Sequence, residues 1–356
     1  MTFRIEIISG LNQKAPAAIL LSTPSQRILL DAGGALDTGS ADWAVPDNLD
    51  AILLSHDHID HIAGLCRLPS HVPVYCSAVT ARSLPARHHV QVIAVRGQFR
   101  LGDLTVTTGS CGHAYGGVWF HFDVPGGLFY SGDISMESAL FRFDPPPRAE
   151  IALVDASYGL YDTPQSQQRA HVAGYLRQPT LCPVPPSGRA VEIALLEAQA
   201  GRLAMALDDD CRAMLMAMAE YDDGSLQPGV QARLRALHQQ LPPFSVAAPL
   251  ILAADPDGLT GMAGELRTQP DFYHRTLFTG HMNPRARQQW QTGEVDFCRW
   301  NVHPTRRCLQ RLVMRLGCHT LAPLFTPLDD VPRWQQALGC TIVTDSSIER
   351  GYVINL

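Results

Sequence analysis

Hydrophobic and polar residues alternate along much of the first 160 residues of the chain. Phe3, Ile5 and Ile7 are separated by polar residues, whereas residues 51–55 begin with an apolar run that shows no alternation. Alternation predicts a strand with one solvated face, and a short unbroken apolar run predicts a strand buried on both faces. Further strands are predicted over residues 17–22, 26–34, 72–76, 104–110, 118–124, 128–133 and 151–157. This part of the chain is therefore expected to form β-sheet.

After residue 163 the apolar residues recur at the spacing of helices. The proline-rich segment 179–188 separates the first two predicted helices. The predicted helices cover residues 163–179, 188–207, 211–221, 230–241 and 304–317, and the predicted strands cover 248–255, 275–280, 319–325 and 340–345. Strands between helices indicate a small α/β unit in the middle of the chain.

The composition is that of a globular protein. The chain has 356 residues, of which 46% are hydrophobic and 17% are charged. Its net charge of −6 excludes a globally basic nucleic-acid binder but leaves room for a locally positive cleft. Lys14 is the only lysine among 28 cationic residues, and the others are arginines, which suit planar recognition of phosphate.

Neither a membrane partner nor secretion is indicated by the sequence. The longest apolar stretch, residues 247–254, is too short to cross a bilayer, and the first residues do not resemble a signal peptide. The nine cysteines are scattered without a Cys-x-x-Cys pair, as expected of reduced thiols. We therefore expect a cytoplasmic protein without a membrane partner, and the oligomeric state stays open, with a homodimer as one alternative.

Four potential metal ligands lie within six residues, directly after the predicted strand 51–55. They are His56, His58, Asp60 and His61. Imidazole and carboxylate groups bind Zn²⁺ at about 2.0–2.2 Å, and residues two apart on an extended loop can face one ion. Asp60 and His61, at the start of a helix, would turn towards a second ion. Core packing does not explain such a cluster.

This segment resembles the His-x-His-x-Asp-His signature of the metallo-β-lactamase superfamily, and the other motifs of that superfamily follow in order. Asp31 matches its first motif, His113 its third and Asp133 its fourth. The resemblance implies an αββα sandwich with two Zn²⁺ ions, of which Asp133 is the shared ligand. The implied ligands are His56, His58 and His113 for one ion and Asp60 and His61 for the other.

Two such ions, about 3.5–4 Å apart, lower the pKa of a bridging water and stabilise a developing oxyanion. The resemblance therefore implies a hydrolase. The metal motifs alone do not choose among esters, amides, lactones, thioesters and phosphodiesters.

Three later segments resemble the β-CASP branch, the nucleic-acid-cutting enzymes of this superfamily. Asp155 lies in the segment that matches the acidic motif of the branch, Gly188, Arg189 and Glu192 match its Gly-Arg-x-x-Glu helix start, and His303 matches its later histidine. The resemblance implies that Gly188 and Arg189 bind substrate phosphate. It also implies that His303 contacts the scissile phosphate or protonates the leaving oxygen.

The same resemblance implies two domains. Residues 1–163 and 299–356 would form the metallo-β-lactamase domain, and residues 164–298 would form an inserted, smaller α/β domain of the β-CASP kind that closes over the site. For the mechanism we expect hydroxide held between the metals to attack. Asp60 would hold a metal, Asp31 and Asp155 would orient ligand histidines, and His303 would act as the general acid.

The sequence departs from the branch pattern after residue 300. No aspartate follows His303 in the usual place, and Phe325 stands near the position of the final histidine that completes the second metal site in RNA-cutting members. His319 comes several residues too early to replace it with ease. We therefore expect a second site formed by Asp60, His61, Asp133 and water, which is weaker or takes Mn²⁺.

The leading hypothesis is a zinc-dependent nuclease that acts on single-stranded RNA or DNA. The alternative is a hydrolase of the same fold that acts on a small lactone, thioester or cyclic phosphodiester. The sequence leaves open whether RNA or DNA is cut and whether cleavage is internal or from an end.

Overall fold

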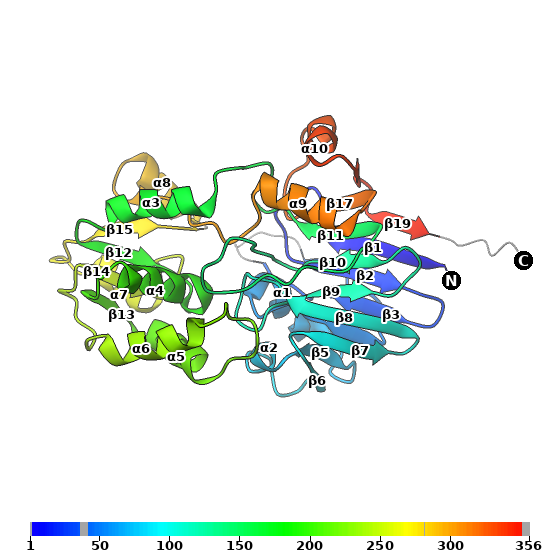
Figure 1. The fold of residues 1–356 in the computed structure, drawn as a ribbon, viewed down its shortest axis with the longest axis horizontal. Helices are drawn as coiled ribbons and strands as arrows, with labels where there is room; N and C mark the ends of the chain where they lie inside the picture. Colours follow the sequence, from blue (N-terminus) through cyan, green and yellow to red (C-terminus); the bar gives the residue numbers. More distant parts are fainter. Residues whose placement is uncertain (1, 36–41, 281, 351–356) are drawn as a thin grey trace, which may run out of the picture.

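Two seven-stranded sheets pack face to face in the computed structural model of the chain, which describes residues 2–35, 42–280 and 282–350 (Figure 1). The first, sheet A, has the order β19-β1-β2-β3-β4-β5-β6. Its strands are β1 (Phe3–Ser9), β2 (Ala18–Ser22), β3 (Arg27–Leu30), β4 (Ala51–Leu53), β5 (Val74–Ser77), β6 (Val90–Ile93) and β19 (Ser347–Arg350). β3 to β6 are parallel, so the carboxyl ends of β3 and β4 meet at one edge.

The second sheet, sheet B, has the order β18-β17-β11-β10-β9-β8-β7. Its strands are β7 (Gly97–Leu101), β8 (Leu104–Ser110), β9 (Val118–Phe122), β10 (Leu128–Tyr130), β11 (Ile151–Asp155), β17 (Thr320–Leu324) and β18 (Thr341–Ile342). β10, β11 and β17 run parallel. The backbone N–H of Val118 donates to the carbonyl oxygen of Ser55 at 2.8 Å, which joins the two sheets at the edge where their strands end.

The main core lies between the two sheets. Ile5, Leu21 and Leu30 of sheet A pack with Phe120 and Leu153 of sheet B, and all five side chains are fully buried. Each such burial stabilises the fold by about 1.5–3 kcal/mol relative to an exposed side chain. The alternation predicted from the sequence therefore places its apolar face in this core.

Helices cover the outer faces of both sheets. The short α1 (Ile59–Ile62), η1 (Ala63–Arg67) and α2 (Ala78–Ala81) lie on the side of sheet A, and α9 (Arg306–Leu316) and α10 (Val331–Leu338) lie on the side of sheet B. α9 buries an apolar stripe at helical spacing, and the Thr305 side chain accepts a hydrogen bond from the Cys308 N–H at its start. The predicted αββα sandwich is confirmed.

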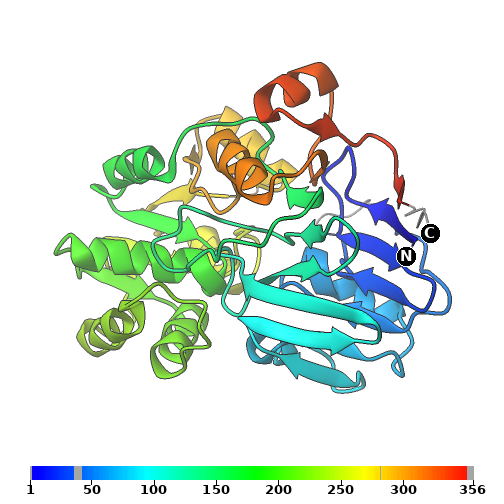
Figure 2. The same cartoon turned by 45° about the vertical axis from the view of Figure 1, so that its right-hand side comes forward.

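A third sheet, sheet C, lies beside the sandwich (Figure 2). It has the order β13-β14-β12-β15-β16 with parallel pairing throughout. Its strands are β12 (Thr180–Pro183), β13 (Met205–Leu207), β14 (Leu250–Ala253), β15 (Arg275–Phe278) and β16 (Asp296–Phe297). The accompanying helices are α3 (Gln165–Tyr175), η2 (Pro186–Ala190), α4 (Val191–Gln199), α5 (Asp209–Glu220), α6 (Val230–Gln240), α7 (Gly261–Thr268) and α8 (Pro284–Gln291). That these elements form an inserted domain with bounds 164–298 stays our proposal.

Two expectations for this region were wrong. The helix predicted over 188–207 ends at Gln199, and residues 205–207 form β13. Residues 180–183, taken as part of a proline-rich separator, form β12 in the middle of sheet C. Parallel pairing explains both errors. Strands of a parallel sheet are buried on both faces, so their apolar residues do not alternate with polar ones, and the spacing of apolar residues does not identify them as strands.

Among the described residues, no helix has the length and apolar character needed to span a bilayer.

Candidate metal centre and catalytic site

The predicted site residues follow the carboxyl ends of strands from both sheets. Asp31 follows β3, His56 and His58 follow β4, and Asp133 follows β10. Asp31 adopts a positive φ of 56°, which aspartate tolerates better than most residues. Gly33 allows this loop to touch α1, because a Cβ on Gly33 would lie 1.9 Å from the Asp60 carbonyl oxygen. The strands therefore bring distant segments of sequence to one edge.

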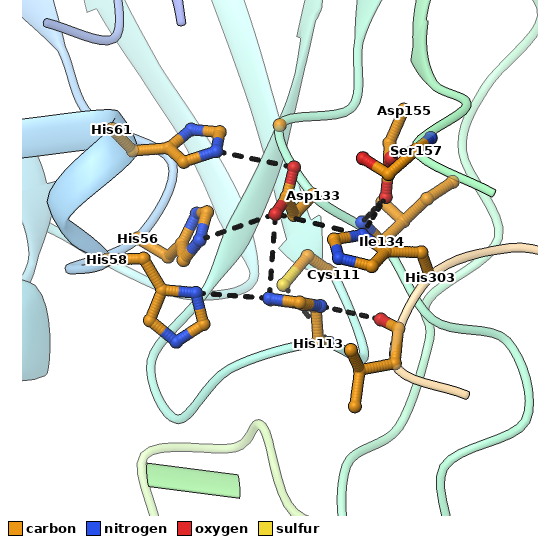
Figure 3. A network of polar contacts seen from close by, with 12 residues as sticks. His56, His58, His61, Cys111, His113, Asp133, Ile134, Asp155, Ser157 and His303 are labelled. Atoms are coloured by element: carbon orange, nitrogen blue, oxygen red, sulfur yellow. Dashed lines mark hydrogen bonds and ion pairs between the residues drawn. The ribbon is translucent and has the colours of Figure 1, made fainter. Parts of the chain in front are cut away.

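Four of the predicted ligands form one group: His56, His58, His113 and Asp133 (Figure 3). One donor atom from each lies within 4.8 Å of the others. Asp133 Oδ2 is 4.0 Å from His56 Nε2 and 3.6 Å from His113 Nε2, and His113 Nε2 is 3.1 Å from His58 Nδ1. Three imidazoles and a carboxylate at these distances suit a tetrahedral divalent cation.

An unpartnered atom supports this fit. His56 is fully buried, and its Nε2 has no hydrogen-bond partner within the described part of the chain. A buried polar atom without a partner is costly, and a metal ion removes that cost. His113 Nδ1 donates to the Val302 carbonyl oxygen at 2.6 Å, which leaves the lone pair on Nε2 facing the group. The donor set therefore fits a divalent metal.

A second group consists of Asp60, His61 and Asp133. His61 Nε2 lies 3.3 Å from Asp133 Oδ1, and His61 Nδ1 donates to Asp31 Oδ2 at 2.7 Å. Asp31 also accepts hydrogen bonds from the Ser55 backbone, the Ser55 hydroxyl and the Tyr130 hydroxyl. The structure thus brings Asp31 into contact with His61, and its role in orienting a metal ligand stays a prediction.

The two groups differ in charge state. Burial lowers the pKa values of His56, His58 and His113, and the neighbouring histidines contribute to the low values. Burial also disfavours charge on His61, but Asp133 and Asp31 outweigh it and raise the His61 pKa well above its usual value. Burial therefore favours neutral imidazole in the first group, which is the form that binds a metal, whereas the two carboxylates favour the protonated form of His61.

Phe325 lies beside His61. Its ring centroid is 5.6 Å from that of His61 in an edge-on arrangement, and the side chain is buried. Where the RNA-cutting members have a histidine, this chain therefore has an apolar side chain that packs beside the second group. His319 is not a substitute ligand, because it lies at the opposite end of β11 from the site. Its backbone N–H donates to the Glu150 carbonyl oxygen, just before β11 begins, whereas Asp155, which lies at the site, is the last residue of β11.

His303 forms a pair with Asp155. His303 Nδ1 donates to Asp155 Oδ2 at 2.8 Å and lies 3.7 Å from Asp133 Oδ2. Asp155 is fully buried and also accepts the backbone N–H groups of Ile134 and Ser157. Asp155 therefore orients His303, and the structure records no contact between it and a ligand histidine of the first two groups within the described residues. Together with Asp133, this pair forms a third group of donor atoms.

Gly188 and Arg189 occupy the irregular helix η2 close to the site. Gly188 has φ 83°, and a Cβ there would lie 3.6 Å from the His113 carbonyl oxygen. Glu192, from the same motif, has a structural contact instead, because it accepts hydrogen bonds from Trp300 Nε1, the Ser138 hydroxyl and the Ala139 N–H. It thereby joins α4 to both neighbouring loops.

Sequence reasoning missed two features of the site. Lys14 was noted only as the sole lysine, yet its ammonium group lies in the field of Asp60, Asp133 and Asp155; burial lowers its pKa, but these carboxylates raise it overall. The loop that carries Lys14 is anchored at both of its ends. At one end the Gly10 carbonyl oxygen accepts the Phe325 N–H, and at the other the Ala17 N–H donates to the Asp60 carbonyl oxygen.

The other missed residue is Arg299, whose guanidinium lies 4.3 Å from the centre of the Tyr158 ring. In the sequence, only Lys14 could have been singled out, because it is the one lysine in an arginine-rich chain.

Comparison with known proteins gives the following matches. The family model described as a beta-lactamase superfamily domain matches residues 26–178. Transcription termination factor FttA of Cenarchaeum symbiosum is 25% identical over 251 residues, which covers 53% of this chain and 38% of that protein. Ribonuclease TTHA0252 of Thermus thermophilus is 27% identical over 206 residues, which covers 49% of this chain and 47% of that protein. The chain thus aligns with less than half the length of either relative.

A solved structure shares the fold. A protein of unknown function from Enterococcus faecalis V583 superposes with a TM-score of 0.66 and covers 98% of this chain and 100% of that chain. The sequence identity is 14%, so the likeness concerns the fold alone.

Proposed function

The chain is a member of the metallo-β-lactamase superfamily, in its nucleic-acid-processing β-CASP branch, and we propose on that premise that it is a metal-dependent phosphodiesterase that cuts single-stranded nucleic acid. The observation that carries the proposal is the His303–Asp155 pair, 3.7 Å from the shared carboxylate Asp133. Phosphodiester cleavage expels an alkoxide, which needs a proton, and this pair stands beside the metal ligands to provide it.

The metal would be held by His56, His58, His113 and Asp133, with Zn²⁺ as the ion that this donor set favours. A divalent cation there polarises phosphate oxygens and lowers the pKa of a water molecule. Asp60 and His61 offer a second, less complete site, for which Mn²⁺ is a candidate.

The chain's own residues then divide the work. His303 gives the proton on Nε2 to the leaving oxygen as the P–O bond breaks, and Asp155 holds the ring through Nδ1. Asp31 fixes the orientation of His61 in the same way, and the Val302 carbonyl fixes that of His113.

Local charge favours an anionic substrate although the net charge is −6. Lys14 lies in the field of Asp60, Asp133 and Asp155. Arg189 and Arg299 lie near Tyr158, whose ring contacts that of His303. Phosphate binding depends on such local charge rather than on the total.

The test is cleavage of matched single-stranded RNA and DNA, each labelled and blocked at one end, with Zn²⁺ or Mn²⁺ added. We expect fragments from at least one strand, and loss of both fragments and bound metal in Asp133→Ala. His319→Ala is the matched control, since it removes a histidine away from the site. If neither strand is cut while a lactone, thioester or cyclic phosphodiester is hydrolysed, the small-molecule alternative replaces this proposal.

A further inference from the structure

Two arginines lie together near Tyr158, whose ring contacts that of His303. The Arg299 guanidinium lies 4.3 Å from the centre of the Tyr158 ring and 5.0 Å from that of Tyr161. The Tyr158 ring in turn lies 5.0 Å from the His303 ring, edge to face. Stacking on two aromatic rings fixes the guanidinium plane without using its N–H donors.

Backbone pairing brings Arg189 to the same place. The Trp300 N–H donates to the Thr279 carbonyl oxygen at 2.9 Å, so the backbone of Arg299 and Trp300 runs beside Thr279 and Gly280. The Arg189 guanidinium packs on Gly280, where a Cβ would lie 2.1 Å from Nη1. The lack of a side chain at residue 280 therefore makes room for Arg189 beside Arg299.

The charges of this pair are not balanced by the described residues. Arg189 Nε is buried and has no hydrogen-bond partner among them, and no ion pair joins either arginine to a described carboxylate. Glu192 lies in the field of Arg189, but its oxygens accept hydrogen bonds from Trp300, Ser138 and Ala139. Burial lowers the pKa of Arg189, and the proximity of Arg299 adds to the effect.

The Thr279 hydroxyl is a second unsatisfied group at this point. The residue is fully buried, and its Oγ1 has no partner within the described part of the chain. Two guanidinium groups that repel each other, with a buried N–H and a buried hydroxyl left free, are stabilised by an anion that accepts from them.

The loop that carries Arg299 also carries His303. The Tyr158 hydroxyl donates to the Trp300 carbonyl and accepts the Val302 N–H, so the path from Arg299 to His303 is fixed along its length. The Tyr158 ring contacts both the Arg299 guanidinium and the His303 ring, which places the arginine pair close to the phosphate that His303 would protonate.

We propose that Arg189 and Arg299 form a second phosphate site, which binds a phosphate of the substrate strand next to the one that is cut. This inference rests on the proposed function and adds to it: the substrate is a polynucleotide with at least one phosphate beyond the scissile group. The pair thereby selects strands over isolated phosphodiesters.

The test compares a single-stranded oligonucleotide with bis(p-nitrophenyl) phosphate, which has one phosphodiester and nothing beyond it. In Arg299→Gln and Arg189→Gln we expect the oligonucleotide KM to rise about tenfold. This change corresponds to the lower limit of the free energy that a hydrogen bond to a charged group contributes. The loss of kcat/KM on the oligonucleotide should exceed that on bis(p-nitrophenyl) phosphate about tenfold. Arg333→Gln, an exposed arginine on α10, is the matched control.

Binding gives a second readout that does not need turnover. With a fluorescent phosphorothioate oligonucleotide and metal-loaded protein, the slope of log affinity against log salt should fall by about 0.7 for each arginine removed. Arg299→Lys keeps the charge and should keep most of the slope, while it loses the planar contacts and still raises KM. This variant also covers the case in which the glutamine variant does not fold.

The outcomes separate the two proposals. Wild-type hydrolysis of the oligonucleotide with unchanged KM and salt slope in all arginine variants overturns the second phosphate site and leaves the phosphodiesterase standing. Oligonucleotide binding that depends on both arginines, without any cleavage, overturns the phosphodiesterase and supports the site. Equal losses on both substrates also overturn the site, because they place the arginines at the scissile phosphate.

Discussion

Replacing Asp155 by asparagine isolates the role of the His303 pair. The substitution keeps the size of a fully buried side chain that accepts three hydrogen bonds, from His303 Nδ1 at 2.8 Å, Ile134 N–H at 3.1 Å and Ser157 N–H at 2.9 Å. An amide has one accepting oxygen and one donating nitrogen, so one side of Asp155 must lose its partner whichever way the amide turns.

The size of the effect follows from these contacts. A hydrogen bond to a charged group contributes about 1.5–3 kcal/mol, and the neutral amide no longer offers His303 a carboxylate as acceptor. If the loss falls on the transition state, kcat decreases roughly 10- to 150-fold. The unpaired backbone N–H lowers stability by a further 1–3 kcal/mol or so, which should appear as a lower Tm.

The assay is kcat on an oligonucleotide together with metal content per chain. Metal content should equal that of the wild type, and Asp103→Asn, an exposed aspartate in the turn between β7 and β8, should change neither quantity. His303→Ala should slow turnover with metal retained, and the double variant should be no slower than His303→Ala alone, because the two residues act as one unit.

Two results would refute this reasoning. If Asp155→Asn loses metal as well as activity, Asp155 is a ligand of the third donor group rather than the partner of His303. If the double variant is slower by the product of the two single effects, Asp155 acts independently of His303.

Three further predictions concern the metal groups. Asp133→Ala should abolish turnover and lower metal content, since Asp133 belongs to all three donor groups, and retention of metal by this variant would contradict its bridging position. Phe325→His should raise metal content towards a second equivalent per chain, because the new imidazole would face the group of Asp60 and His61; unchanged content measured by elemental analysis would contradict this. Metal bound by His56, His58 and His113 should be retained as the pH falls below 6.5, the ordinary pKa of histidine, because the pKa values of these three residues are lowered. The metal affinity of the group with His61 should increase as the pH rises, because the raised pKa of His61 means that metal binding must displace a proton. One common midpoint near pH 6.5 in a titration of metal content would refute this difference.

The sequence sufficed for elements whose patterns are local. The strand predicted over 104–110 coincides with β8, and the helix predicted over 230–241 differs from α6 by one residue, because alternation and helical spacing are properties of short windows. The residues of the candidate donor groups could also be found from the sequence, since four of them lie in one segment. β12 and β13 were missed because only pairing with β14 makes these short apolar segments strands.

Contacts between distant segments account for the rest. The sequence indicated Asp155 and His303, but not that they bind each other across 148 positions, and so Asp155 was expected to orient a metal ligand instead. Arg299 gave no signal at all, because its place depends on Tyr158 and on the pairing of residue 300 with residue 279. Such residues are found only when the fold is known.

The acidic net charge and an anionic substrate are compatible because the acids of the site are already engaged. Asp31 accepts hydrogen bonds from His61, Ser55 and Tyr130. Asp155 accepts hydrogen bonds from His303, Ile134 and Ser157, so both carboxylates already have partners within the protein. Asp133 and Asp60 are left to a divalent cation. For the proposed phosphate substrate, a metal in these groups and the pair Arg189 and Arg299 would supply the positive charge.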